Sequence, residues 1–180
     1  MSNLKEKYQT RMAVIRAQSQ SGAALTLLDI EAEHTMVAST TPEAMVLQLE
    51  IGAERSAREL LRHTPPQRSE FEMAIEPIED EIIRIHRLIE KNSVLVTDSL
   101  ELKAIALLAG VPESEQMLLH IDAMERVFSR LAAVIQGKPA SSEGIPEDNA
   151  FAMRLLILRE FMHHLQFDSI RIFTNSAVAT

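Results

Sequence analysis

Two copies of one short pattern, a glutamate followed three positions later by a histidine, are the residues of this chain best suited to chemistry. They are Glu31 with His34 and Glu160 with His163. Residues three positions apart lie on one face of a helix. A carboxylate and an imidazole presented in this way by facing helices hold two iron or manganese ions in four-helix bundles. The two pairs therefore form a candidate metal site, and a divalent metal ion is the cofactor that it would bind.

A second pattern overlaps the first. Arg159 is followed, after four intervening residues, by His164. This spacing resembles the Arg-x4-6-His motif of HEPN-type helical ribonucleases, although Glu160 stands where that motif generally has Asn or Asp. The resemblance covers six residues of the chain. It implies that Arg159 and His164 are catalytic residues that cleave a phosphodiester across a dimer.

A third interpretation gives these polar residues no chemistry. The segment 155–167 is otherwise apolar, and buried polar groups usually just have hydrogen-bond partners. In this interpretation its arginine, glutamate and histidines only pair with neighbouring helices.

Glu79, Glu90 and Glu125 are further carboxylates that could complete a metal site, and the sequence singles out none of them.

The spacing of apolar residues predicts that helices position all of these groups. Glycine is scarce, no Asn-Gly or Asp-Gly hairpin signal occurs, and long segments repeat with a period near 3.6 residues. We therefore expect an all-α fold, a bundle of about seven helices with a largely buried C-terminal helix. The expected helices span about 3–18, 22–38, 41–63, 67–91 with a kink or new helix at Pro77, 99–109, 117–135 and 146–173. The short β-like run 94–96 is expected to be a connector.

The length of the chain predicts a single domain over residues 1–180. A chain of this size buries roughly 70% of the surface that its unfolded form exposes, so it can form a core without disulfides. A segment rich in Pro, Gly and Ser predicts a surface loop at about 137–147, and the last residues, about 175–180, are expected to fray.

Composition excludes several classes of protein. The chain has 18 Lys and Arg against 26 Asp and Glu, a net charge of −8, which argues against direct DNA binding. It has no cysteine, so it has neither a disulfide framework nor a thiol nucleophile. We find no secretory signal and no apolar run near the ~20 residues that span a bilayer. A cytoplasmic protein without membrane contact is expected.

The function expected from these features is protein interaction. Isoleucines at 78, 82, 85 and 89 form a narrow apolar seam, and the chain has nine methionines, which suit adaptable surfaces. We therefore expect a helical regulatory or protein-interaction module that forms a homodimer or binds another protein. The alternatives are the metal-binding bundle and the HEPN-like ribonuclease described above. The sequence identifies no small-molecule ligand.

Overall fold

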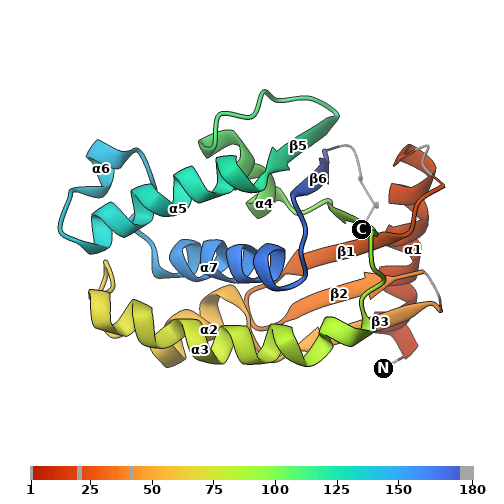
Figure 1. The fold of residues 1–180 in the computed structure, drawn as a ribbon, viewed down its shortest axis with the longest axis horizontal. Coiled ribbons are helices and arrows are strands. Elements are labelled where there is room, and N and C mark those ends of the chain that lie inside the picture. The colour runs from red at the N-terminus through yellow and green to blue at the C-terminus, as the bar shows by residue number, and fades with distance from the viewer. Residues whose placement is uncertain (1, 20–21, 41–42, 175–180) are drawn as a thin grey trace.

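The computed structural model describes residues 2–19, 22–40 and 43–174 (Figure 1). The helices are α1 (Ser2–Ser19), α2 (Ala53–Leu60), α3 (Arg68–Ile85), the 3-10 helix η1 (His86–Leu88), α4 (Leu100–Leu108), α5 (Ile121–Ile135), α6 (Ala140–Glu143) and α7 (Asn149–His164). The strands are β1 (Leu25–Ile30), β2 (Thr35–Ser39), β3 (Met45–Leu49), β4 (Val94–Thr97), β5 (Gln116–His120) and β6 (Ser169–Phe173). The predicted frayed tail and the predicted helix start at 41–42 lie outside the described residues.

The strands form one mixed six-stranded sheet in the order β3-β2-β1-β4-β6-β5. β1, β4 and β6 run parallel to one another, whereas β2, β3 and β5 are antiparallel to their neighbours. The protein is therefore an α/β protein, and the predicted all-α bundle of about seven helices is wrong.

The largest error concerns the segment predicted as a helix over 22–38, which forms the β1–β2 hairpin. Every residue of β1 and β2 is buried. A strand covered on both faces has no apolar-polar alternation, so its sequence cannot be told from that of a buried helix. The same reason applies to 94–96, which is not a connector but most of the central strand β4.

Three other predicted helices each contain a strand and a helix. The range 41–63 contains β3 and α2, 117–135 contains most of β5 and all of α5, and 146–173 contains α7 and β6. β5 passes into α5 without a loop, because His120 ends the strand and Ile121 begins the helix. The apolar spacing that predicted one helix over 117–135 therefore runs across the boundary between β5 and α5. Pro77 lies inside the continuous helix α3, which packs against α7 through the buried Ile78 and Ile82.

Two apolar layers hold the sheet. On one face, helices α2 to α5 and α7 pack over Leu28, Ile30, Leu95 and Ile172. On the other face, α1 packs over Leu25, Leu27, Val96 and Phe173 through three side chains, Tyr8, Met12 and Ile15. Figure 1 shows α2, α3, α5 and α7 together on the left and α1 by itself on the right.

The first part of the C-terminal segment has the burial that the sequence predicted. Ten residues of α7 between Phe151 and Met162 are buried, but the helix ends at His164. The predicted surface loop at 137–147 contains the short helix α6. Among the described residues, no helix has both the length and the apolar character needed to cross a membrane.

Candidate functional site

Two aspartates lie side by side where neighbouring parallel strands end. β1 and β4 pair with Leu27 opposite Val96. Parallel strands advance together, so two residues further along Asp29 comes opposite Asp98. Leu27 and Val96 both pack under α1, and side chains two positions apart point to the same face. Both carboxylates therefore face α1, and their side chains are 12% and 7% exposed.

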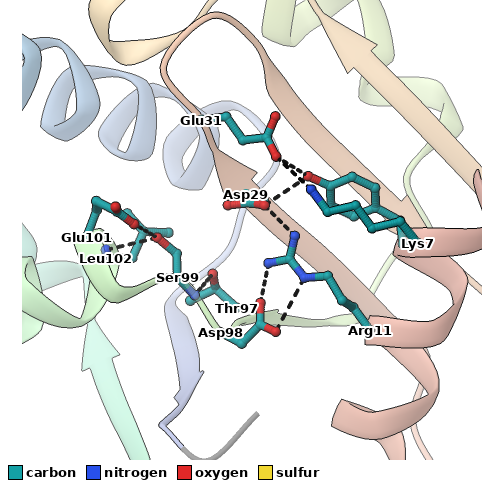
Figure 2. Close-up of polar contacts among 10 residues, drawn as sticks. Lys7, Arg11, Asp29, Glu31, Thr97, Asp98, Ser99, Glu101 and Leu102 are labelled. Atoms are coloured by element: carbon teal, nitrogen blue, oxygen red, sulfur yellow. Dashed lines mark hydrogen bonds and ion pairs between the residues drawn. The ribbon is translucent and has the colours of Figure 1, made fainter. Parts of the chain in front are cut away.

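Arg11 of α1 bridges the two aspartates (Figure 2). Its Nη1 binds Oδ2 of Asp29, its Nη2 binds Oδ1 of Asp98, and its Nε donates to Oδ2 of Asp98 at 3.3 Å. Burial by itself would lower the pKa of this guanidinium. The hydrogen bonds and charges of Asp98 and Asp29 outweigh burial and raise the pKa above its ordinary value. Arg11 is therefore a permanent cation fixed between two anions.

Tyr8 and Glu31 extend this network along β1. The Tyr8 hydroxyl lies 2.9 Å from Oδ2 of Asp29 and 2.8 Å from Oε1 of Glu31. Lys7 approaches the same Glu31 oxygen at 3.3 Å. The Arg11 guanidinium lies 4.9 Å from the centre of the Tyr8 ring, within the range of a cation–π contact. We call Tyr8, Arg11, Asp29, Glu31 and Asp98 the acidic site.

The acidic site retains negative charge and unused oxygen atoms. Its three carboxylates face two cations, Arg11 and the half-exposed Lys7, so one negative charge is unbalanced. Among the described residues, no hydrogen bond reaches Oδ1 of Asp29 or Oε2 of Glu31. Carboxylate oxygens with excess negative charge are what Mg²⁺ and Mn²⁺ prefer. The arrangement can therefore attract a hard divalent cation.

The start of α4 keeps Asp98 available for Arg11. The N-cap of α4 is Ser99, whose Oγ accepts from the backbone N–H of Leu102 at 3.3 Å. The N–H of Ser99 in turn donates to Oγ1 of Thr97 at 3.1 Å. Figure 2 shows these bonds beside the acidic site. Because Ser99 caps the helix, Asp98 points to α1.

The turn between β1 and β2 is fixed by close contact with the start of α2. The N–H of Ala53 donates to the carbonyl of Glu31 at 2.9 Å. A Cβ on Gly52 would come within 2.3 Å of the backbone of Glu33 and 2.5 Å of that of Ala32. The backbones therefore meet at a distance that a side chain would prevent, and this contact positions Glu31.

The structure does not gather the four residues of the predicted metal site into one cluster. Glu31 and His34 lie in the β1–β2 turn, whereas Glu160 and His163 lie near the end of α7. Nδ1 of His34 is 3.7 Å from a carboxylate oxygen of Glu50, its nearest acidic neighbour in the structure. No described cluster of metal-binding groups includes Glu31 or His34.

The C-terminal end of α7 carries a separate charged network. Nη1 of Arg159 binds Oε1 of the buried Glu160 at 2.6 Å. Oε1 of Glu125, on α5, lies 2.9 Å from Nε of Arg159 and 2.5 Å from Nε2 of His163. Nε2 of His164 instead lies near Glu160 and near Glu79 of α3. Arg159 and His164 are thus on one helix, each with carboxylate partners.

Comparison with known proteins identifies the fold. No protein-family model matches the chain, and no curated protein matches it. Solved structures do match. The Aquifex aeolicus PPX-GPPA enzyme has a TM-score of 0.68 at 13% identity over 86% of this chain and 55% of its own. An exopolyphosphatase from Cytophaga hutchinsonii has a TM-score of 0.65 at 13% identity over 89% of this chain and 57% of its own.

The chain has the fold of these Ppx/GppA enzymes. It spans little more than half of their length. The predicted function is wrong, because a non-catalytic helical regulatory module does not fit an α/β fold shared with phosphohydrolases. The HEPN-like ribonuclease and the metal-binding helical bundle are wrong for the same reason, since both require an all-helical fold. Homodimer formation stays a prediction.

Sequence analysis missed the central residues of the acidic site. Asp29 was placed within the expected helix 22–38 and Asp98 just before the expected helix 99–109, so nothing brought them together. The only signal was at Asp98, which follows the run 94–97 with its β-branched Val and Thr residues. For Arg11 no local signal exists, since its partners lie 18 and 87 positions away.

Proposed function

We propose that this chain is a cation-dependent phosphohydrolase domain of the Ppx/GppA type, acting on a phosphate chain at the acidic site. The observation that carries the proposal is the in-register pair Asp29 and Asp98, at the carboxyl ends of adjacent parallel strands. In open α/β sheets, ligands bind outside this end of the strands. The solved structures with this fold are described as phosphatases and exopolyphosphatases.

The charge of the acidic site makes the proposed activity depend on a metal ion. The β1–β2 turn has no glycine and carries Glu31 and Glu33, so its backbone is a poor phosphate cradle and its side chains repel phosphate. A divalent cation that binds the carboxylates of the acidic site and the phosphate oxygens together removes the repulsion. Oδ1 of Asp29 and Oε2 of Glu31 are the free oxygen atoms that support this role.

Arg11 and the aspartates supply the remaining chemistry. Three of the five N–H groups of Arg11 form hydrogen bonds with Asp29 and Asp98, so two remain for phosphate oxygens. Hydrolysis requires a water oxygen to bond to the terminal phosphorus while the phosphoanhydride P–O bond breaks. An aspartate of the pair would accept a proton of that water. The attacked phosphorus becomes orthophosphate, and the shortened phosphate chain leaves with the oxygen of the broken bond.

The test is release of orthophosphate from polyphosphate by the full chain, with Mg²⁺ or Mn²⁺ and with a chelator. We expect metal-dependent release that falls at least about 100-fold in Asp98→Asn and Asp29→Asn. Glu33→Gln is the control, because it removes one carboxylate charge at an exposed residue that is paired with Arg58 and lies outside the acidic site. Circular dichroism shows whether each variant is folded. No release by the folded wild type, or equal release by folded Asp98→Asn, contradicts the proposal.

A further inference from the structure

A second group of ligating side chains lies away from the acidic site, where α3 meets the end of α7. It consists of Glu79, Glu160 and His164, each of which offers one ligand atom, all within 4.8 Å of one another. α7 ends at His164, five residues before β6 begins. β6 is parallel to β4, so this group lies toward the amino ends of the parallel strands, whereas the acidic site lies at their carboxyl ends. The two sites are independent.

The distances in this group are those of ligands around one metal ion. Nε2 of His164 lies 3.3 Å from Oε1 of Glu79 and 3.4 Å from Oε2 of Glu160. Two ligand atoms at about 2.1 Å from a tetrahedral ion are about 3.4 Å apart. Among the described residues, Nε2 of His164 makes no hydrogen bond to either carboxylate or to any other group. A ring nitrogen therefore converges on two oxygens without a directional bond to them.

Glu160 is held as an oriented ligand. Its side chain is 3% exposed, and its Oε1 accepts from Nη1 of Arg159 at 2.6 Å. The other oxygen, Oε2, is the one that faces His164. A ligand fixed through its second oxygen by a neighbouring donor is the usual support of a metal site. Because Glu160 precedes His164 by four residues, the helix places both side chains on the same face.

The local charge also favours a cation. Arg159 pairs with Glu125 and Glu160, and Glu79 lies near His164. Three carboxylates thus share one guanidinium cation, and two negative charges remain when the imidazoles are neutral. A divalent ion neutralises this excess. Glu79 and His164 are 35% and 31% exposed, so an ion can enter from solvent to reach the buried Glu160.

We propose that Glu79, Glu160 and His164 bind a divalent transition-metal ion such as Zn²⁺ or Mn²⁺, with at least one coordination position open to water. One imidazole and two carboxylates form a ligand set suited to these ions. The ligands differ from those predicted from sequence, because His164 replaces His163 and Glu79 replaces the pair in the β1–β2 turn.

The test is isothermal titration of the tag-free full chain with Zn²⁺ and with Mn²⁺ after treatment with a chelator. Loss of a group that only orients a ligand costs about 10–100-fold in affinity, so His164→Ala should weaken binding at least about 100-fold. His163→Ala is the matched control, because it removes the adjacent imidazole, and its affinity should stay within about threefold of the wild type. Each variant lacks one histidine and keeps all the others, so binding by the other histidines is the same in both.

Glu79→Gln is a second variant that separates loss of metal affinity from loss of folding. Glu79 is partly exposed, so the variant should fold, and it should lose affinity as His164→Ala does. In the wild type, bound Zn²⁺ should raise the melting temperature by linkage, and in Glu79→Gln this rise should disappear. If the wild type binds no Zn²⁺ or Mn²⁺ beyond what His164→Ala still binds, this overturns the proposal. So does an equal loss of affinity in His163→Ala, or full affinity in folded Glu79→Gln.

Discussion

The hydroxyl of Tyr8 lies 2.9 Å from Oδ2 of Asp29, which is also the oxygen bound by Arg11. One carboxylate oxygen thus joins a neutral phenol and a cation, both from α1. The helix contributes an apolar layer to the sheet and, through the same side chains, controls the charge of the acidic site. Its sequence fits both tasks, since Tyr8, Arg11, Met12 and Ile15 repeat at helical spacing.

The ionisation of Tyr8 should be coupled to unfolding. Burial, then the charge of Asp29 and the hydrogen bond to Glu31, raise the pKa of the phenol well above its ordinary value. In the unfolded chain it ionises near pH 10. Above that pH the unfolded chain binds fewer protons than the folded one, so stability should fall as pH rises through about 10. Below that pH the contribution of Tyr8 is complete.

The chain has one tyrosine and no tryptophan, so phenolate absorbance reports Tyr8 without interference. We expect this absorbance to appear together with loss of the helical circular dichroism signal. In urea the same protein should titrate near pH 10. Titration near that pH with the dichroism signal intact would show that the phenol is not buried against the carboxylates. Tyr8→Phe should lose less stability over the same pH range.

Removing the Arg11 cation should strengthen the binding of Mg²⁺ at the acidic site. Arg11→Met keeps most of the side-chain volume but leaves Asp29 and Asp98 facing each other without a counter-charge. Removing one partner of a buried ion pair costs about 3–5 kcal/mol, so urea denaturation should show a loss near the lower end of that range. Millimolar Mg²⁺ should restore much of the loss, because the ion replaces the guanidinium.

Arg16→Met is the control for this change. It removes an arginine from the same helix, where Arg16 binds Oγ1 of Thr40 at 2.6 Å and, among the described residues, no carboxylate. Mg²⁺ should stabilise this variant no more than it stabilises the wild type. If Mg²⁺ stabilises both variants equally, the effect comes from general ionic screening and the two aspartates do not bind the ion.

Gly52→Ala should disturb the turn that carries Glu31. The added Cβ would meet only backbone atoms, at 2.3 to 2.5 Å, and backbone cannot move aside as a flexible side chain can. Overpacking typically costs about 1–3 kcal/mol, and rigid surroundings favour the upper end. Thermal denaturation measures this loss. Gly22→Ala is the control, because nothing lies within 4 Å of a Cβ there. Equal stability of the two variants would mean that the turn yields easily.

The sequence was informative where one helical face is solvated. Helix α1 covers the range predicted for the first helix, about 3–18, and the buried isoleucines of α3 lie where their spacing placed them. The sequence was misleading for strands that are buried on both faces. β1 and β2 are buried at every position, so the period that distinguishes strand from helix is absent from the residues themselves.

The acidic site shows a second limit. Its residues come from α1, β1 and the end of β4, and only strand pairing brings them together. An all-helical interpretation has no such pairing, so it cannot place Asp29 opposite Asp98. At the end of α7, helical spacing is local, so the sequence could group Glu160, His163 and His164. Which histidine lies near Glu79 depends on where α3 lies, and this the sequence did not determine.

Arg130 should hold the segment that the sequence predicted as a loose surface loop. Its guanidinium donates to three backbone carbonyls, those of Glu143 at 2.6 Å, Leu108 at 2.8 Å and Gly144 at 2.8 Å. Hydrogen bonds to a charged group contribute about 1.5–3 kcal/mol. We expect Arg130→Ala and Arg130→Lys to lose at least about 1.5 kcal/mol each, since an ammonium lacks the fork that reaches all three carbonyls.

Limited proteolysis and urea denaturation together separate a local effect from a global one. Cleavage within 137–147 should accelerate in both Arg130 variants, because the carbonyls that anchor α6 to α4 and α5 lose their common donor. Arg126→Ala is the control, an exposed arginine one helical turn earlier on α5. Arg130→Lys with wild-type stability and wild-type cleavage would show that positive charge alone, and not the planar fork, holds this segment.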